Sequence, residues 1–334
     1  PFNGLNYKNN KDYLAARENS KDPAFNFARL WGCENLEQGS HARKDGVWDF
    51  RTIEAKNGML MSKHMAADVG QGIFYLGAGK TKPLGGFTDI ATGSVKGFIS
   101  GAAITNEQYP QGYYVGKLRT RYKGYAESDP WQNPGAWFAF WLHGPVHEFD
   151  LMEQTVGEAN IINYVNQYHN GWGTYGKPNG VTATFHTKLK VTAGEEAVQN
   201  NWYTLALQWT ADQVTYYYNN IWAHYYKSDS ENKIATFTKN SNLSSAGFTL
   251  EGSWNTGDTY NASQRATQCT DWGYNGHLKA VPTCPVNVFL STEIGGGWGA
   301  GSGSLSGKLE TLPVWVEADY IAYYVPEGSS EAAN

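Results

Sequence analysis

The chain has 334 residues, of which 41% are hydrophobic and 15% aromatic, and its formal net charge is −5. This length and apolar content suffice for one large core or two small ones. The acidic balance and the scarcity of Lys/Arg clusters argue against a nucleic-acid or anionic-membrane partner, since either would need a basic stripe. No apolar run of about 18 residues is present, so we expect no membrane span.

Short alternating runs, separated by Gly, Asn, Asp and Pro, predict β-strands throughout the chain. No long amphipathic helix and no Ser/Gly/Pro-rich linker interrupts them, so we predict a single all-β domain over residues 1–334, a β-sandwich or barrel, with a frayed tail at 326–334. In chain order, strands are expected at 58–64, 112–122, 136–142, 147–154, 161–169, 181–190, 203–209, 214–218, 286–294 and 314–325.

Three carboxylates crowd into one predicted strand whose other side chains are largely apolar. Strand side chains alternate between faces, so Glu148 and Asp150 point to the same face. Strict alternation would put Glu153 on the opposite face. One extra residue at Leu151 or Met152, a β-bulge, returns Glu153 to the face of the other two acids, and bulges often lie beside active sites. The spacing therefore predicts a bulge.

This arrangement suits glycoside hydrolysis. Glu148 and Glu153 would have Cα atoms about 13 Å apart, four strand steps of ~3.3 Å. Side chains leaning inward would bring the carboxyls to the separation of about 5 to 5.5 Å that a retaining glycosidase uses. Asp150 would hydrogen-bond the nucleophile and keep the two glutamates from ionising together. The alternative is an acidic surface strand with no catalytic role.

The cysteines and the N-terminal residues indicate whether the protein binds zinc, forms disulfides or is secreted. Cys33, Cys269 and Cys284 are too few for a disulfide scaffold, and no Cys/His spacing resembles a zinc site. A Cys269–Cys284 disulfide and three free thiols are equally compatible with the sequence. The chain opens at Pro1 without a basic and apolar leader, so we expect a processed secretion signal and an extracellular or periplasmic protein.

The stretch HEFDLMEQ resembles the bulged motif E-x-D-x-x-E of glycoside hydrolase family sixteen. Other segments agree in the family's order, and the resemblance covers residues 50–325. These segments are GYYVGKLRTRYK (112–123), WFAFWLHG (137–144), NWYTLALQWTADQVTYYYNN (201–220), VNVFLSTEIGGGW (286–298) and VEADYIAYY (316–324). The insertion at 253–285 has no counterpart, and we expect it to reshape one end of the cleft.

The resemblance implies a jelly-roll β-sandwich of two curved antiparallel sheets, with a concave substrate cleft and endo-hydrolysis of a β-linked polysaccharide with retention. Glu148 would be the nucleophile, Asp150 its helper and Glu153 the acid/base. The bulge separates the chain from lichenases and xyloglucan transglycosylases and favours hydrolysis over transfer. No cofactor is implied. A structural Ca²⁺, found in many relatives, is compatible, although no Asp-rich loop demands it. We expect a monomer whose partner is the polysaccharide.

Aromatic and histidine side chains are the candidates for sugar binding, because an indole ring buries the apolar face of a sugar. Trp137 and Trp141 share one strand face, and Trp141 matches the family's tryptophan beside the scissile sugar. His143 and His169 would hydrogen-bond sugar hydroxyls. Core packing of these aromatics and a structural role for the histidines are the alternatives. Tryptophans of Gly-rich loops are further candidates: Trp172, Trp254, Trp272 and Trp298.

Two substrates compete within the resemblance. Laminarinases usually carry Gly where this chain has His147, and the turn from Leu142 to Glu148 is short, as in enzymes acting on agar, porphyran or carrageenan. Trp137 is laminarinase-like. We favour a marine galactan over β-1,3-glucan. A sulfated galactan would need a cation near the cleft, for which Arg121 is a candidate. A non-catalytic glycan-binding lectin is the remaining alternative.

Overall fold

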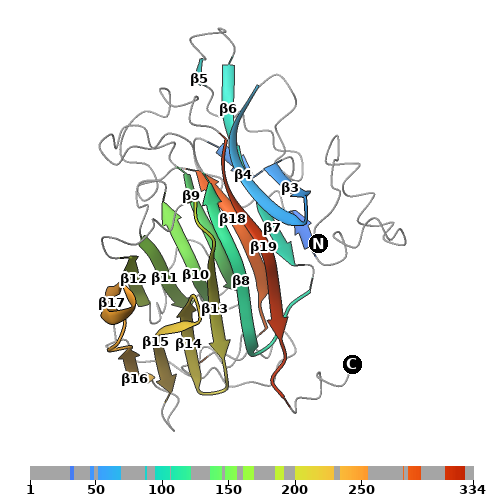
Figure 1. Ribbon diagram of the computed structural model, residues 1–334. Coiled ribbons are helices and arrows are strands. Elements are labelled where there is room, and N and C mark those ends of the chain that lie inside the picture. The colour runs from blue at the N-terminus through green and yellow to red at the C-terminus, as the bar shows by residue number, and fades with distance from the viewer. Residues whose placement is uncertain are drawn as a thin grey trace.

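The computed structural model describes residues 31–33, 46–48, 52–68, 87–88, 95–105, 107–121, 136–144, 147–155, 161–168, 185–191, 200–228, 234–254, 281, 285–294 and 313–327. Most of these residues form strands in two stacked sheets, and a short 3-10 turn, η5 (Ser244–Ala246), precedes β17 (Phe248–Trp254) (Figure 1). Within these ranges no helix is long and apolar enough to cross a membrane.

The smaller sheet has eight strands, and every pairing in it is antiparallel. Its centre is built from strands far apart in the sequence, because β18 pairs with β9. In spatial order the strands are β1 (Trp31–Cys33), β7 (Ala102–Thr105), β18 (Asn287–Ile294), β9 (Ala136–His143), β10 (His147–Thr155), β11 (Ile161–Tyr168), β12 (Phe185–Val191) and β17 (Phe248–Trp254).

The larger sheet has eleven strands. Its pairings are antiparallel except that β2 runs parallel to β6, which departs from the wholly antiparallel sandwich that we expected. In spatial order the strands are β16 (Ile234–Lys239), β15 (Ile221–Ser228), β14 (Gln213–Tyr218), β13 (Tyr203–Trp209), β8 (Gly112–Arg121), β19 (Val314–Tyr324), β4 (Met59–Asp68), β6 (Val95–Ser100) and β2 (Gly46–Trp48), with β3 (Ile53–Lys56) beside β4 and β5 (Phe87–Thr88) beside β6.

Two tight hairpins follow directly from turn chemistry. Asn57 and Gly58 join β3 to β4 with φ of 54° and 79°, and Asn219 and Asn220 join β14 to β15 with φ of 45° and 66°. Positive φ at both central residues matches the twist of the flanking strands, and Asn and Gly tolerate it better than other residues. The first turn fits a strand expected from residue 58, whereas β15 was not predicted.

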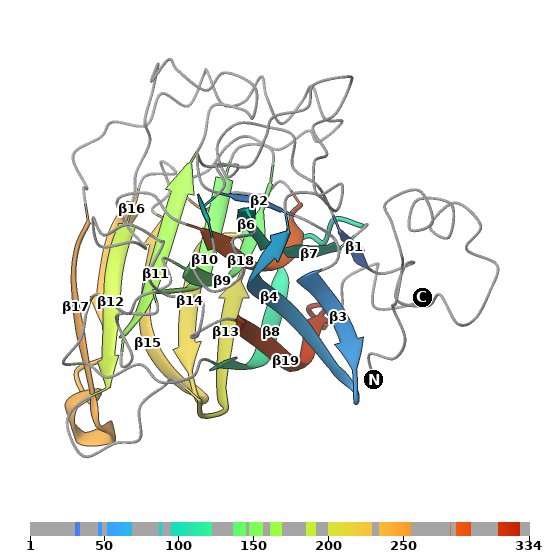
Figure 2. The ribbon, with the colours of Figure 1, turned by 90° about the horizontal axis from the view of Figure 1, so that it is seen from above.

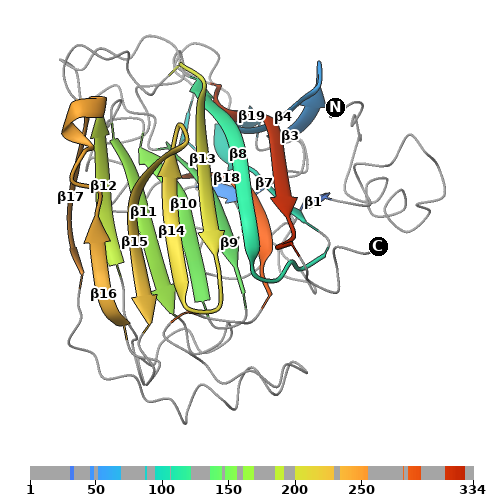
Figure 3. The same cartoon turned by 60° about the horizontal axis from the view of Figure 1, so that its bottom comes forward.

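The main core lies between the two sheets, whose inward side chains alternate with outward ones along each strand. Phe140 of β9 packs against β8 at Gly116, where an added Cβ would lie only 2.9 Å from the phenyl ring. A glycine at this position therefore lets the sheets approach closely. The view from above separates β8, β13 and β14 from β9, β10 and β18 (Figure 2), and the tilted view shows the same layering (Figure 3).

The predicted all-β sandwich is confirmed, and every strand expected from the sequence coincides with an observed one. Phe138, Phe140 and Leu142 are each 0% exposed, which confirms that this face of β9 belongs to the core. Most of the predicted insertion at 253–285 and most of the predicted tail lie outside the described residues. The division of the chain into a single domain stays a prediction.

Candidate active site

The β10 strand contains the bulge that the acidic motif predicts. Asp150 lies opposite Trp141 of β9, whereas Met152 lies opposite the preceding residue, Phe140. Leu151 therefore has no partner on β9, and the pairing with β11 is irregular over the same stretch. The predicted bulge is confirmed at Leu151, and this residue points into the core with 0% exposure.

The bulge gathers the three acids on the face of β10 that points away from the main core. Glu148 lies opposite His143 and Glu153 lies opposite Ala139, so the two glutamates are four strand steps apart, about 13 Å between Cα atoms. Both are half-buried, and Asp150 between them is 2% exposed. The predicted grouping of the three acids on one face is therefore present in the backbone register.

The floor beside these acids is a second hydrophobic cluster, separate from the main core. It consists of Ala102, Ile104, Trp137, Ala139, Trp141 and Phe289. Trp141 stacks on Phe289 of β18 with ring centroids 4.0 Å apart and an interplanar angle of 24°. Its Nε1–H donates a hydrogen bond to Ser291 Oγ at 3.0 Å. The position of this indole is thus fixed by a strand that lies far away in the sequence.

Trp137 and Trp141 lie on the predicted face but are buried in this cluster, with exposed fractions of 4% and 3%. For both residues the alternative to sugar binding was packing in a hydrophobic core, and both pack in this cluster. Contact with a sugar stays a prediction. Sequence reasoning did not identify Phe289 or Ser291 as parts of this site. The alternating run at 286–294 predicted their strand, but no local signal shows that it pairs with β9.

The two histidines at the turn between β9 and β10 have different surroundings. His143 is half-buried on the face of the acids and lies edge-on to Trp141 and Phe289, at centroid distances of 5.9 and 6.2 Å. His147 is fully buried on the core side, where its ring packs edge-on against Phe149 at 5.0 Å and Trp209 at 5.4 Å. Only His143 is brought to the face of the acids.

Polar contacts tie the bulged strand to the larger sheet behind it. Thr120 Oγ1 donates to Gln154 Oε1 at 2.7 Å, and the Tyr203 hydroxyl donates to Met152 Sδ at 2.9 Å. Burial raises the pKa of Tyr203 above its usual value of 10.0, so this hydroxyl stays protonated. These contacts hold the strand from the core side while leaving the outward face to the acids.

Two predicted sugar-binding residues belong to strands away from the acids. Arg121 lies opposite Trp315 on the outward face of the larger sheet, at positions that alternate with buried Leu118 and Thr120. Trp254 ends β17, the edge strand of the smaller sheet, three strands away from β10. Outside the described residues lie His169, Trp172, Trp272 and Trp298, together with Cys269 and Cys284.

The described part of the chain holds no group of three or more His, Cys, Asp or Glu side chains placed to bind a metal ion. The three acids of β10 place carboxyl groups on one outward face. A carboxylate can attack an electrophilic carbon, and a carboxylic acid can donate a proton.

Neither a protein-family model nor a curated protein sequence matches the chain. Solved structures do resemble it. The laminarinase catalytic domain of Thermotoga maritima superposes with a TM-score of 0.51 at 14% identity, covering 92% of this chain and 94% of that one. A family-sixteen glycoside hydrolase of the mixed-linkage glucan system of Bacteroides ovatus gives 0.51 at 13% identity, covering 89% and 95%.

An endo-acting O-glycanase from the human gut microbiota, described as initiating mucin breakdown, gives a TM-score of 0.55 at 13% identity and covers 92% of this chain and 88% of that one. Identities this low bear on the architecture alone. The chain therefore has the jelly-roll sandwich fold of family-sixteen glycoside hydrolases.

Proposed function

We propose that the protein is a retaining endo-glycoside hydrolase that cleaves a β-linked polysaccharide. Glu148 is the nucleophile, Glu153 the acid/base and Asp150 the group that supports the nucleophile. The observation that carries the proposal is the bulge at Leu151, which puts three acids on one outward face despite a sequence spacing that would otherwise divide them. An acidic surface strand without a catalytic role would need no such irregularity.

The register supports retention of configuration. With Cα atoms about 13 Å apart on one strand, the two glutamates can lean toward each other and leave the gap of about 5 to 5.5 Å that a covalent intermediate requires. An inverting enzyme needs about 6.5 to 9.5 Å to seat a water molecule as well. Half-buried glutamates beside an aromatic floor suit a sugar chain, since the rings exclude water from the reacting centre.

The reaction proceeds in two displacements. The Glu148 carboxylate attacks the anomeric carbon while the bond to the leaving oxygen breaks, and that oxygen takes the Glu153 proton. A water molecule then gives a proton to Glu153 and attacks the same carbon, which releases Glu148 and restores both groups. Asp150 is almost fully buried between them, and we propose that its carboxyl group hydrogen-bonds the nucleophile during the reaction. Two carboxyl groups and water complete this cycle, so we propose that no cofactor is needed.

For the substrate we propose a marine galactan of the agar, porphyran or carrageenan type. His147 supports this choice, because it precedes the nucleophile and packs against Phe149 and Trp209, where laminarinases usually carry Gly. A β-1,3-glucan is the second candidate. It is supported by laminarinase-like Trp137 in the floor cluster and by the fold shared with the Thermotoga laminarinase. We further propose that the protein acts as a secreted monomer.

The first test incubates the protein with laminarin, agarose, porphyran and carrageenans, sizes the products, and follows the first anomer formed by NMR. We expect the β-anomer first and a ladder of oligosaccharides. Glu148→Gln should lower the rate by at least about a thousandfold. Glu251→Gln is the matched control, because Glu251 is an exposed glutamate of the same sheet, and its rate should not change.

Azide distinguishes the two glutamates. With an activated aryl oligosaccharide, Glu148→Gly plus azide should give an α-glycosyl azide, and Glu153→Gly plus azide should give the β-glycosyl azide. An α-anomer as the first product of the unmodified enzyme would contradict the double displacement. Binding of glycans without turnover, unaffected by Glu148→Gln, would show a lectin instead.

A further inference from the structure

A second aromatic surface lies on the outward face of the larger sheet, on the far side of the sandwich from the acids. Its members alternate with side chains of the main core along β8, β14, β15 and β19. Tyr320 and Tyr324 are 41% and 58% exposed, and the others are half-buried. We name this surface the aromatic platform, formed by Tyr113, Tyr217, Trp222, Tyr225, Tyr320 and Tyr324.

Two strand irregularities assemble the platform. In β15, Tyr216 pairs with His224 but Tyr217 pairs with Trp222, so Ala223 has no register partner on β14, and it is fully buried. Without this bulge, Trp222 and Tyr225 would lie on opposite faces, because they are three residues apart. The bulge therefore brings two aromatic rings of one strand to the same surface.

The second irregularity is in β19. Ala318 pairs with Leu118 and Tyr320 pairs with Lys117, so Asp319 is the extra residue. From Tyr320 onward, every second side chain then lies on the outward face, which includes Tyr324. Regular alternation from buried Ala318 would have sent both tyrosines into the core.

Two groups of contacting rings form a strip across neighbouring strands, and the register pair of Tyr217 with Trp222 connects the groups. Tyr113 lies 6.3 Å from Tyr324 and 6.0 Å from Tyr217 between centroids, and Trp222 lies 5.8 Å from Tyr225. Register pairings connect Tyr324 to Tyr225 through five adjacent strands, a span of about 19 Å at ~4.8 Å per strand. Small buried residues of the same face, Val115 and Ala206, pair with each other in the neighbouring register row, where Ala206 also pairs with Tyr217.

The polar groups of the platform are uncharged. The Tyr217 hydroxyl donates to Gln208 Oε1 at 2.9 Å. Burial raises the pKa of Tyr113 and of Tyr217, so both hydroxyls remain protonated donors. Flat rings with neutral hydroxyl and amide groups match the two surfaces of a sugar, its apolar C–H face and its hydroxyl edge.

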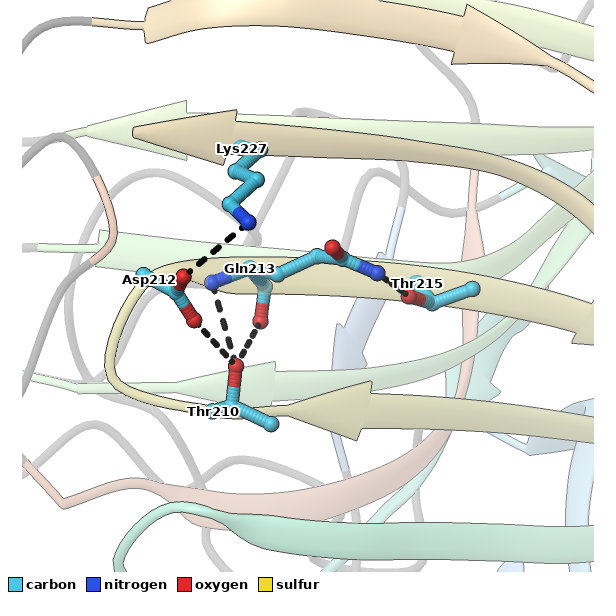
Figure 4. A network of polar contacts seen from close by, with 5 residues as sticks. All are labelled: Thr210, Asp212, Gln213, Thr215 and Lys227. Atoms are coloured by element: carbon cyan, nitrogen blue, oxygen red, sulfur yellow. Dashed lines mark hydrogen bonds and ion pairs between the residues drawn. The ribbon is translucent and has the colours of Figure 1, made fainter. Parts of the chain in front are cut away.

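Charged residues at both ends of the strip are paired within the protein. Lys117 Nζ lies 2.8 Å from Asp319 Oδ2 at one end. At the other end, Lys227 Nζ lies 3.4 Å from Asp212 Oδ2, and the Thr210 hydroxyl bonds Asp212 as well (Figure 4). The centre of the platform thus offers no charge among its described residues, which favours a neutral ligand over an anionic one.

We infer that the aromatic platform binds a neutral β-linked polysaccharide at a second site, separate from the acids. Both sheets lie between the two sites, so one glycan chain bound to the platform does not occupy the acid-bearing face. The inference that this glycan is also the substrate rests on the proposed function. Holding a long chain on the far side raises the local concentration of polymer at the reacting face.

The test uses the Glu148→Gln protein in native gels containing laminarin, soluble agarose or κ-carrageenan. Tyr324→Ala and Tyr225→Ala remove rings at the two ends of the strip. Each should weaken binding of a neutral glycan about fivefold, and the double variant more. Tyr324→Phe and Tyr225→Phe keep the rings and should retain most of the binding, and Lys190→Ala, exposed on the other sheet, should change nothing. Thermal unfolding checks that every variant is folded.

In the active protein, the platform variants should hydrolyse short oligosaccharides at the normal rate and the polymer more slowly. If the unmodified protein hydrolyses a glycan and the folded double variant binds and cleaves the polymer equally well, the platform inference fails alone. If no glycan is hydrolysed but gel binding still requires the rings, the proposed function fails and the inference stands. Binding confined to carrageenan, or a dimer that the double variant dissociates, would overturn it.

Discussion

The outward faces of the two sheets are both aromatic and both depend on a bulge, yet they differ in what the bulge presents. In β10 the extra residue Leu151 is buried, and the neighbouring outward positions carry acids. In β15 the extra residue Ala223 is buried in the same way, and the outward positions carry rings. A bulge therefore decides which side chains share a face, while their chemistry decides what that face can do.

The aromatic floor beside the acids is buried, whereas the platform is partly exposed, so truncating a ring should lower the free energy of unfolding much more on the first face than on the second. Phe289→Ala removes the ring on which Trp141 stacks, and we expect it to lower the free energy of unfolding by about 3 kcal/mol. Tyr324→Ala, at a 58% exposed position, should change it by less than about 0.5 kcal/mol. Urea titrations measure both, and equal losses would contradict the comparison.

Deleting Leu151 tests what the bulge contributes by itself. The deletion restores regular alternation and leaves Glu148, Asp150 and Glu153 on the outward face with the same spacing. We expect a loss of about 2 kcal/mol in the free energy of unfolding, since a buried leucine is removed. Hydrolysis of the preferred polysaccharide by the folded variant should persist within about tenfold.

Leu151→Ala is the control for this deletion, because it shortens the side chain and keeps the backbone irregularity. Complete loss of hydrolysis in the folded deletion variant, with normal hydrolysis in Leu151→Ala, would mean that the irregular backbone itself positions the acids.

The inward side of the strand beneath the platform carries a titratable group, His224. Its ring stacks on Tyr216 at 4.7 Å and Phe237 at 5.3 Å, and Lys239 faces it across the pairing of β15 with β16. Burial, followed by the charge of Lys239, lowers the pKa of His224 from 6.5 to about 3. As the pH falls below 6.5, His224 becomes protonated in the unfolded chain but stays neutral in the folded protein. The free energy of unfolding therefore declines until about pH 3.

This decline should contribute about 1 kcal/mol for each pH unit in that window. His224→Gln removes the group, so the dependence of its unfolding free energy on pH between 6.5 and 4 should be shallower by that amount. Urea titrations at several pH values compare the slopes, which do not depend on what the substitution costs in packing. Parallel slopes would show that another group dominates acid unfolding.

The acid-bearing site was more predictable from sequence than the platform. Glu148, Asp150 and Glu153 can act together only if they lie on one face of the strand. With their spacing this requires a bulge, so the bulge could be predicted from the sequence. The spacing of tyrosines does not indicate their face in the same way, because tyrosine is compatible with both the buried and the exposed face of a strand. The run beginning Gly112-Tyr113-Tyr114 has aromatic residues on both faces, which is why sequence reasoning could not tell that Arg121 lies on the side away from the acids.

The pairing between strands that are distant in the sequence could not be predicted from the sequence either. The alternating pattern predicted β18, but its position against β9, which places Ser291 beside Trp141, depends on packing between segments that no local pattern connects. The missed strand β15 could have been found, because Asn219-Asn220 between two aromatic-rich runs is a hairpin signal.

The pairing of β18 with β9 also sets an order of events during biosynthesis. Trp141 and its hydrogen-bond partner Ser291 are 150 positions apart, so the acids leave the ribosome long before the strand that completes their floor. Nascent chains that end before β18 lack the strand that pairs with β9 on the side away from β10. Such late, long-range closure is typical of slowly folding proteins, and truncated chains of this protein should depend on chaperones until β18 emerges.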